Sequence, residues 1–134
     1  MLDLNTLLAD AILDTYDANF PAGSLLEIRT GAPAGADLAA GGVLLCTITL
    51  PAAPWAAAGG IGSKAKGAAA WSDVGTAAAG AGTNAGHFRL KNAAGTKLEE
   101  GTITATGGGG DATIDNVSIA TGQVVNVTSF THTL

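Results

Sequence analysis

The N-terminal part of the chain carries apolar side chains at a spacing of three and four residues. They are Leu4, Leu8, Ala11, Ile12 and Tyr16. This spacing places them on one side of a helix, so we predict a single amphipathic helix over residues 2–20. Three aspartates fall mostly on its other side, and Pro21 ends it because proline cannot continue the hydrogen-bond ladder. Since an isolated helix of this length is marginal in water, its apolar side must pack against something.

Two alternatives are open for the partner of this apolar side. The helix either covers the open end of the domain's own sheet or docks on a neighbouring subunit. We therefore take Leu4, Leu8, Ile12 and Tyr16 as candidate interface residues. Trp55 joins them, because an indole in an irregular segment either fills the edge of the core or anchors an interface.

After Ser24 the pattern changes from a helical spacing to alternation of apolar and polar residues, interrupted by glycine and alanine. Alternation with a period of two is typical of half-buried strands. The predicted strands are 25–30, 43–50, 64–71, 86–92, 97–106, 111–117 and 123–133. Six or seven short strands separated by glycine-bearing turns indicate an antiparallel β-sandwich or jelly-roll-like domain. We therefore divide the chain into a helix with its linker, 1–23, and a β-domain, 24–134.

Alternation also assigns the faces of the strands. In 43–50 the inward positions are Leu44, Cys46, Ile48 and Leu50. The charged residues of the other strands fall on the opposite face, which we expect to be solvated; they are Glu27, Arg29, His87, Arg89 and Lys91. In the last strand Val125 and Val127 share a parity that Phe130 does not. Either a bulge separates them or both faces are buried there.

The composition indicates a thin core. The chain has 134 residues, of which 47% are hydrophobic, but only 4% are aromatic and 20 are glycine. Much of the hydrophobic content is alanine, whose methyl group gains far less on burial than a large aliphatic side chain does. A domain of this kind is marginal alone, so we expect a homo-oligomer or a chain docked on a larger surface.

The charge pattern excludes two kinds of partner. The net charge is −5 and the six Lys and Arg residues are scattered, whereas nucleic-acid binding needs clustered cations. For the same reason we expect no attraction to an anionic membrane. No apolar run approaches the ~20 residues of a membrane span, and the acidic N-terminus does not resemble a secretory signal. We expect the chain to be made in the cytoplasm.

No group of residues in the sequence has the spacing of a catalytic or ligand-binding site. Cys46 is predicted to be a buried hydrophobe without a base beside it, and His87 and His132 lack neighbouring metal ligands. The GGGGDATID segment invites a calcium interpretation, but it occurs once, and a turn between strands is the simpler one. We predict that the chain is not an enzyme and has no catalytic, cofactor-binding or metal-binding residues.

Three segments that together cover nearly the whole chain carry a family resemblance. They are LADAILDTYDANFPAG (8–23), LLEIRTGAPAGADLAAGGVLLCTITL (25–50) and HFRLKNAAGTKLEEGTITATGGGGDATIDNVSIATGQVVNVTSFT (87–131). The order of helix, strands, Ala/Gly loops, glycine run and closing threonine-rich strand resembles small virion structural proteins of tailed bacteriophages. The resemblance lies in a pattern of strands and turns and includes no active-site motif.

The resemblance implies a β-sandwich present in many copies on the virion head. Such a decoration or cement protein binds and stabilises the lattice of the major capsid protein, and often forms trimers. Two alternatives remain: a structural protein of the tail or head–tail junction, and a carbohydrate-binding module for host attachment. The last would need an exposed aromatic platform, for which Trp55 and Trp71 are the two tryptophans available.

Overall fold

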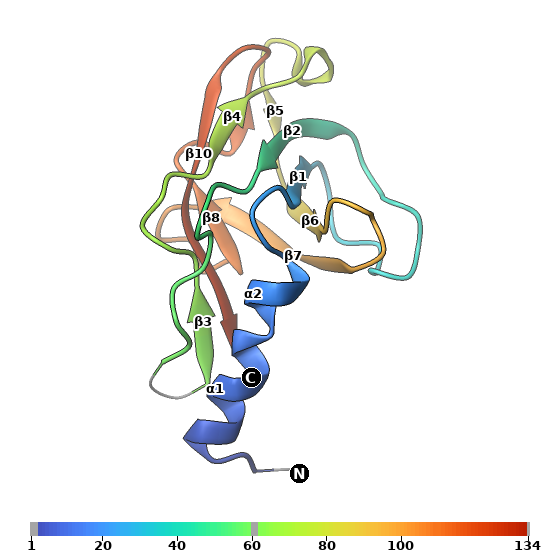
Figure 1. Ribbon diagram of the computed structural model, residues 1–134. Coiled ribbons are helices and arrows are strands. Elements are labelled where there is room, and N and C mark those ends of the chain that lie inside the picture. Colours follow the sequence, from blue (N-terminus) through green and yellow to red (C-terminus); the bar gives the residue numbers. More distant parts are fainter. Residues whose placement is uncertain (1–2, 60–61, 134) are drawn as a thin grey trace.

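The chain folds as a mainly β domain with a helical N-terminal segment (Figure 1). A computed structural model describes residues 3–59 and 62–133. The helical elements are α1 (Thr6–Asp14), α2 (Tyr16–Asn19) and the short 3₁₀ helix η1 (Ala77–Ala79). The strands are β1 (Leu25–Arg29), β2 (Leu44–Thr49), β3 (Ser63–Ala65), β4 (Ser72–Val74), β5 (Thr83–Asn84), β6 (His87–Lys91), β7 (Leu98–Ala105), β8 (Ala112–Ile114), β9 (Ser118–Ile119) and β10 (Val124–Thr133). This confirms the predicted fold class at the level of a β domain preceded by a helix.

The predicted helix is present but starts later and is interrupted. Asn5 caps α1, because its Oδ1 accepts a hydrogen bond of 3.0 Å from the backbone N–H of Leu8. The helix breaks at Thr15, whose hydroxyl donates to the carbonyl of Ile12 at 2.6 Å and competes with the regular backbone ladder. The predicted first residue, Leu2, lies outside the described residues.

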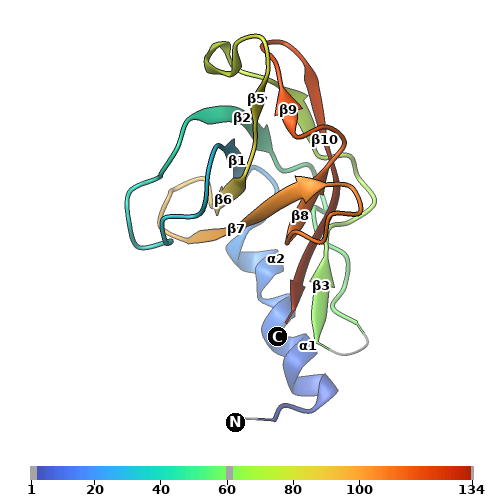
Figure 2. The ribbon, with the colours of Figure 1, turned by 180° about the vertical axis from the view of Figure 1, so that it is seen from behind.

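Most strands join one curled, mixed sheet, seen from opposite sides in Figures 1 and 2. Its order is β2-β1-β6-β7-β8-β10-β3, and β4 also pairs with β10, which makes eight strands. Strands β5 and β9 form a second, two-stranded sheet. Among the strands of the described residues, all pairs are antiparallel except β7–β8, which is parallel. The expected purely antiparallel arrangement is therefore wrong at this one pair.

The glycine run between β7 and β8 explains the parallel pair. Parallel neighbours normally need a long crossover connection, whereas here the chain returns directly through 106–111. Gly107 has a φ of +85°, which favours glycine, and Gly110 N–H donates to Thr104 Oγ1 at 3.0 Å. A Cβ on Gly108 would lie 2.7 Å from the Thr104 side chain. The run is thus a compact turn, as predicted for this segment.

The core lies on the concave side of the sheet and is centred on aromatic rings. Phe130 packs on Phe88 with ring centroids 4.7 Å apart, and Trp55 meets Trp71 edge-on at 5.1 Å. A β-bulge between Val127 and Ser129 changes the parity of β10 and turns Phe130 inward. This bulge resolves the two alternatives that the sequence left open for the last strand.

The outer face of β1, β6 and β7 is not the solvated face that alternation predicted. The loop 31–42 folds over it, and Glu27, His87 and Arg89 are all buried. Arg89 donates to the carbonyls of Gly35 and Leu38 at 3.2 and 2.7 Å and forms a 2.5 Å ion pair with Glu100. The charges are paired beneath the loop, which the strand pattern alone does not reveal.

Candidate functional site

The N-terminal helix leaves most of its predicted apolar side, except Tyr16, on the surface of the single chain. Ala9 and Leu13 are the buried residues of α1. The large apolar side chains of the outward side are exposed by 37% at Leu4, 80% at Leu7, 50% at Leu8 and 41% at Ile12. We call these four residues the α1 stripe. The predicted packing residues Leu4, Leu8 and Ile12 therefore lie on the surface of the single chain.

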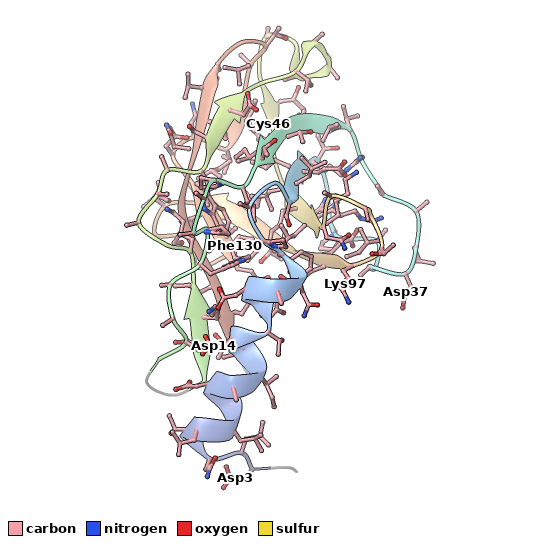
Figure 3. The ribbon with its side chains drawn as sticks, in the orientation of Figure 1. Asp3, Asp14, Asp37, Cys46, Lys97 and Phe130 are labelled. Atoms are coloured by element: carbon pink, nitrogen blue, oxygen red, sulfur yellow. The ribbon has the colours of Figure 1, made fainter. Side chains whose placement is uncertain are left out.

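A buried lysine explains this orientation. The Lys64 side chain on β3 is fully buried, and its Nζ lies 2.7 Å from Asp14 Oδ1 and 3.0 Å from Asp17 Oδ2. Figure 3 shows Asp14 on the side of the helix next to β3. Because a buried ammonium needs compensating charge, the aspartates face the sheet and the α1 stripe faces outward.

The electrostatics of this pair are consistent with a tight contact. The Lys64 ammonium is the main cause that lowers the pKa of Asp14, helped by a 2.9 Å hydrogen bond from the Ala58 N–H. Burial alone would lower the pKa of Lys64, but the hydrogen bonds to Asp14 and Asp17 outweigh it and raise that pKa. Both shifts favour the ionised pair.

A second contact fastens α2 through Tyr16. Its hydroxyl donates to Glu99 Oε2 at 2.6 Å, and its ring centroid lies 3.9 Å from that of His132. His132 Nε2 is hydrogen-bonded to the other oxygen of Glu99. Burial, followed by the hydrogen bond to Glu99, raises the pKa of Tyr16, so the phenol stays protonated. Tyr16 thus joins the helix to β7 and β10.

An open cleft of about 410 Å³ separates the helix from the β6–β7 hairpin. Its lining residues come from the helix, the hairpin and the end of β10; they are Ile12, Leu13, Thr15, Tyr16, Asn19, Phe20, Lys97, Leu98, Glu99, His132 and Thr133. Ile12 belongs both to this cleft and to the α1 stripe. The exposed apolar surface of the helix therefore continues into the cleft.

Trp55 lies in the core and not on the surface. It is 7% exposed, and its indole N–H donates to the carbonyl of Phe20 at 2.8 Å. Trp71 is still more deeply buried. Of the two alternatives for Trp55, the structure places it at the edge of the core. Neither indole offers a flat exposed ring to a sugar.

The groups considered for chemistry have structural roles. Cys46 is buried, and burial together with the nearby Asp73 raises the pKa of its thiol to about 11. Asp111 Oδ2 accepts a 2.9 Å hydrogen bond from Thr102 N–H, and Asp115 accepts from the backbone and side chain of Asn126. Within 3–59 and 62–133, no cluster of three or more His, Cys, Asp or Glu side chains is arranged to hold a metal ion.

Burial and hydrogen bonding act in opposite directions on Asp115. Burial would raise the pKa of its carboxyl group. The hydrogen bonds from Asn126 and Asn116 outweigh that effect and hold the pKa below its ordinary value. The carboxylate therefore serves as a fixed acceptor for the turn between β8 and β9. No helix within the described residues is long and apolar enough to cross a membrane.

Sequence reasoning missed two features of this region. Leu7 is the most exposed residue of the α1 stripe, and its spacing of three from Leu4 was the signal that could have included it. Lys64 gave no comparable signal, because its partners Asp14 and Asp17 are far away in the sequence. The structure brings Tyr16 and Trp55 together, with ring centroids 5.9 Å apart, and leaves Leu4 and Leu8 on the surface.

Comparison with known proteins gives no match to this chain among family models, curated proteins or solved structures.

Proposed function

We propose that this chain is a structural component of a tailed-phage virion, and that it decorates the head by binding the lattice of the major capsid protein. The observation that carries the proposal is the α1 stripe. Four large apolar side chains stand outward, three of them on α1 and Leu4 just before it, and ion pairs fix the other side of the helix to the sheet. An exposed apolar patch on a small domain is typical of a surface that binds another protein.

The position of the helix supports this role. In both ribbon views, α1 runs away from the main body of the sheet, with the N-terminal end at its tip (Figures 1 and 2). The curled sheet would then supply the compact body that a β-sandwich supplies in the proteins the chain resembles. A projecting helix can enter a groove between lattice subunits, in the way amphipathic helices dock by their apolar side.

The small size of the α1 stripe favours a multivalent assembly. Four side chains cover much less than the ~800 Å² that each partner buries in a typical stable interface. Repeated weak contacts around a lattice, or within a trimer of this chain, would add up to strong retention. We therefore include copies of the chain itself among the proposed partners, with a trimer as the favoured state.

A tail or head–tail-junction location is the alternative within the virion, and copy number separates the two. The carbohydrate-binding alternative has no support in the geometry, because Trp55 and Trp71 are both buried. The proposal also includes no catalytic, metal or cofactor role. The acidic net charge of −5 suits an outer surface away from packaged DNA.

Cryo-electron microscopy of particles that contain the chain tests the proposal. We expect density for the domain at repeated positions on the outside of the shell, with α1 against the capsid protein. Copies in the hundreds per particle support a head location. Density confined to the tail, or purified chain that does not associate with shells, would contradict it.

A further inference from the structure

A second feature of the fold lies away from the α1 stripe, where β7 and β10 separate. Strand β8 lies between them, but it pairs with only the last part of β7, Ile103–Ala105. Below β8 the two strands diverge, as Figure 2 shows. A cleft of about 290 Å³ occupies this opening, and its lining includes Glu99, Glu100, Phe130 and Thr133.

The backbone of β7 faces this opening with hydrogen-bonding groups. The Ile103 N–H and the Lys97 carbonyl are bonded toward the β6 side. Because successive residues of a strand point their backbone groups to opposite sides, the N–H and C=O of Leu98 and Glu100 point away from β6 and into the opening. The Thr102 N–H likewise points away from β6, since it donates to Asp111 Oδ2.

The edge of β10 faces the same opening from the other side. The Phe130 carbonyl accepts from Lys66 on the β3 side, whereas the Thr131 N–H donates to the carbonyl of Asp111 at 3.1 Å. By alternation, the backbone groups of Thr133 point into the opening. Asp111, just before β8, is thus bonded to both β7 and β10. On the side of Asp111 away from β8, no strand of the described part of the chain lies between β7 and β10.

We propose that this opening is a site for strand addition, which takes an extended polypeptide segment of a partner protein. Such a segment would continue the line of β8 and pair with the outward-facing backbone groups of β7, β10 or both. Main-chain hydrogen bonds would supply affinity, as in other cases of strand addition at exposed sheet edges. Unpaired edges that remain accessible are the usual templates for such pairing.

Charge favours a partner segment that carries Lys or Arg. Three carboxylates line the cleft, from Glu99, Glu100 and Asp111, and its lining includes no Lys or Arg. Glu100 is neutralised by Arg89 and Glu99 is bonded to His132, but Asp111 forms no salt bridge within the described residues. A basic residue that flanks the added strand would therefore pair with Asp111.

The test uses the folded chain and a synthetic peptide, Lys-Thr-Val-Thr-Val-Thr-Lys, as the probe. We expect saturable binding by NMR titration, with slowed hydrogen exchange at the backbone N–H groups of Leu98, Glu100 and Thr133. A peptide of the same sequence, N-methylated at alternate residues, keeps the side chains but loses the strand donors. It should bind about tenfold more weakly or worse.

Two variants locate the contact on the protein. Leu98→Pro removes a donor at the first residue of β7, a position where strands tolerate proline, and Thr133→Pro removes one at the end of β10. Each variant should keep cooperative unfolding, and at least one should bind the probe about tenfold more weakly than the parent chain. If one variant does not fold, the affinity of the other variant for the probe decides the test.

Three outcomes would overturn the proposal. The first is equal binding of the N-methylated probe. The second is protection at an edge other than β7 or β10, or no protection at all up to millimolar probe. The third is protection that grows with protein concentration without probe, which would identify a second copy of the chain as the occupant. None of these readouts depends on the virion role proposed above.

Discussion

The N-terminal helix packs beside β3, and the loop 31–42 lies over β1 and β6. Each is held by a buried cation, but the two attachments differ. Arg89 and Glu100 beneath the loop are both buried, with 7% and 4% of their side chains exposed. Lys64 beneath the helix is also buried, but its partner Asp14 is half-exposed. The loop is therefore closed on its sheet, whereas water reaches the helix attachment. This difference indicates that the loop is a fixed part of the fold and that the helix is the more loosely attached of the two segments.

Removing Arg89 should produce the largest loss of stability. Arg89→Met leaves Glu100 as a buried carboxylate without its cation and takes the donor away from two loop carbonyls. We expect the free energy of unfolding to fall by about 3–5 kcal/mol, the usual cost of breaking a buried pair from one side. Chemical denaturation measures this loss.

A double variant and a surface variant are the controls for Arg89. Arg89→Met combined with Glu100→Leu removes both charges and should recover a large part of the loss. Lys97→Met, at an exposed position, should stay within about 0.5 kcal/mol of the parent chain. A cost for Arg89→Met no larger than that of Lys97→Met would contradict the closed loop.

Replacing Lys64 should have a smaller effect. In Lys64→Met the two carboxylates lose their cation, but Asp14 and Asp17 regain water because they are already half-exposed. We expect a loss of about 1–2 kcal/mol, with faster hydrogen exchange concentrated in α1 and α2. If exchange accelerates equally in β6 and β7, the helix is not a separately attached segment.

Acid should loosen the attachment of the helix. The pKa of Asp14 lies below its ordinary value of 3.8, so the stabilisation it provides is complete above that pH and is lost as the pH falls through the lowered pKa. We expect exchange in 6–19 to accelerate below about pH 4. Asp14→Asn should remove part of this dependence, and an unchanged profile in that variant would refute the assignment.

The β character of the chain could be predicted from local patterns, whereas the cover of its faces could not. Alternation located β1, β2, β6, β7 and β10, since apolar and polar residues alternate along most of each strand with a period of two. It failed at Arg89, because only the folded chain shows that an Ala/Gly loop lies over that face. Whether such a charged side chain is buried depends on its contacts in the folded chain and cannot be read from its spacing in the sequence.

The orientation of the helix shows the same limit more sharply. Leu4, Leu8 and Ile12 form an apolar side by periodicity, and the general rule is that such a side packs inward. Lys64, on a strand far along the chain, reverses this by attracting Asp14 and Asp17. Of the candidate residues, Leu4, Leu8 and Ile12 do not pack on the chain's own sheet, whereas Tyr16 and Trp55 do pack against its core. Docking of the exposed residues on another subunit stays a prediction.

The most direct test of the α1 stripe is the binding of Leu8→Lys to viral shells. Leu8 is half-exposed, so the substitution should change the free energy of unfolding by less than about 0.5 kcal/mol. Leu38→Lys makes the same chemical change at an exposed position of the loop 31–42. Copies bound per shell, counted after co-sedimentation, should drop sharply for Leu8→Lys and stay at the parent level for Leu38→Lys. Equal retention of the two variants would contradict a docking role for the helix.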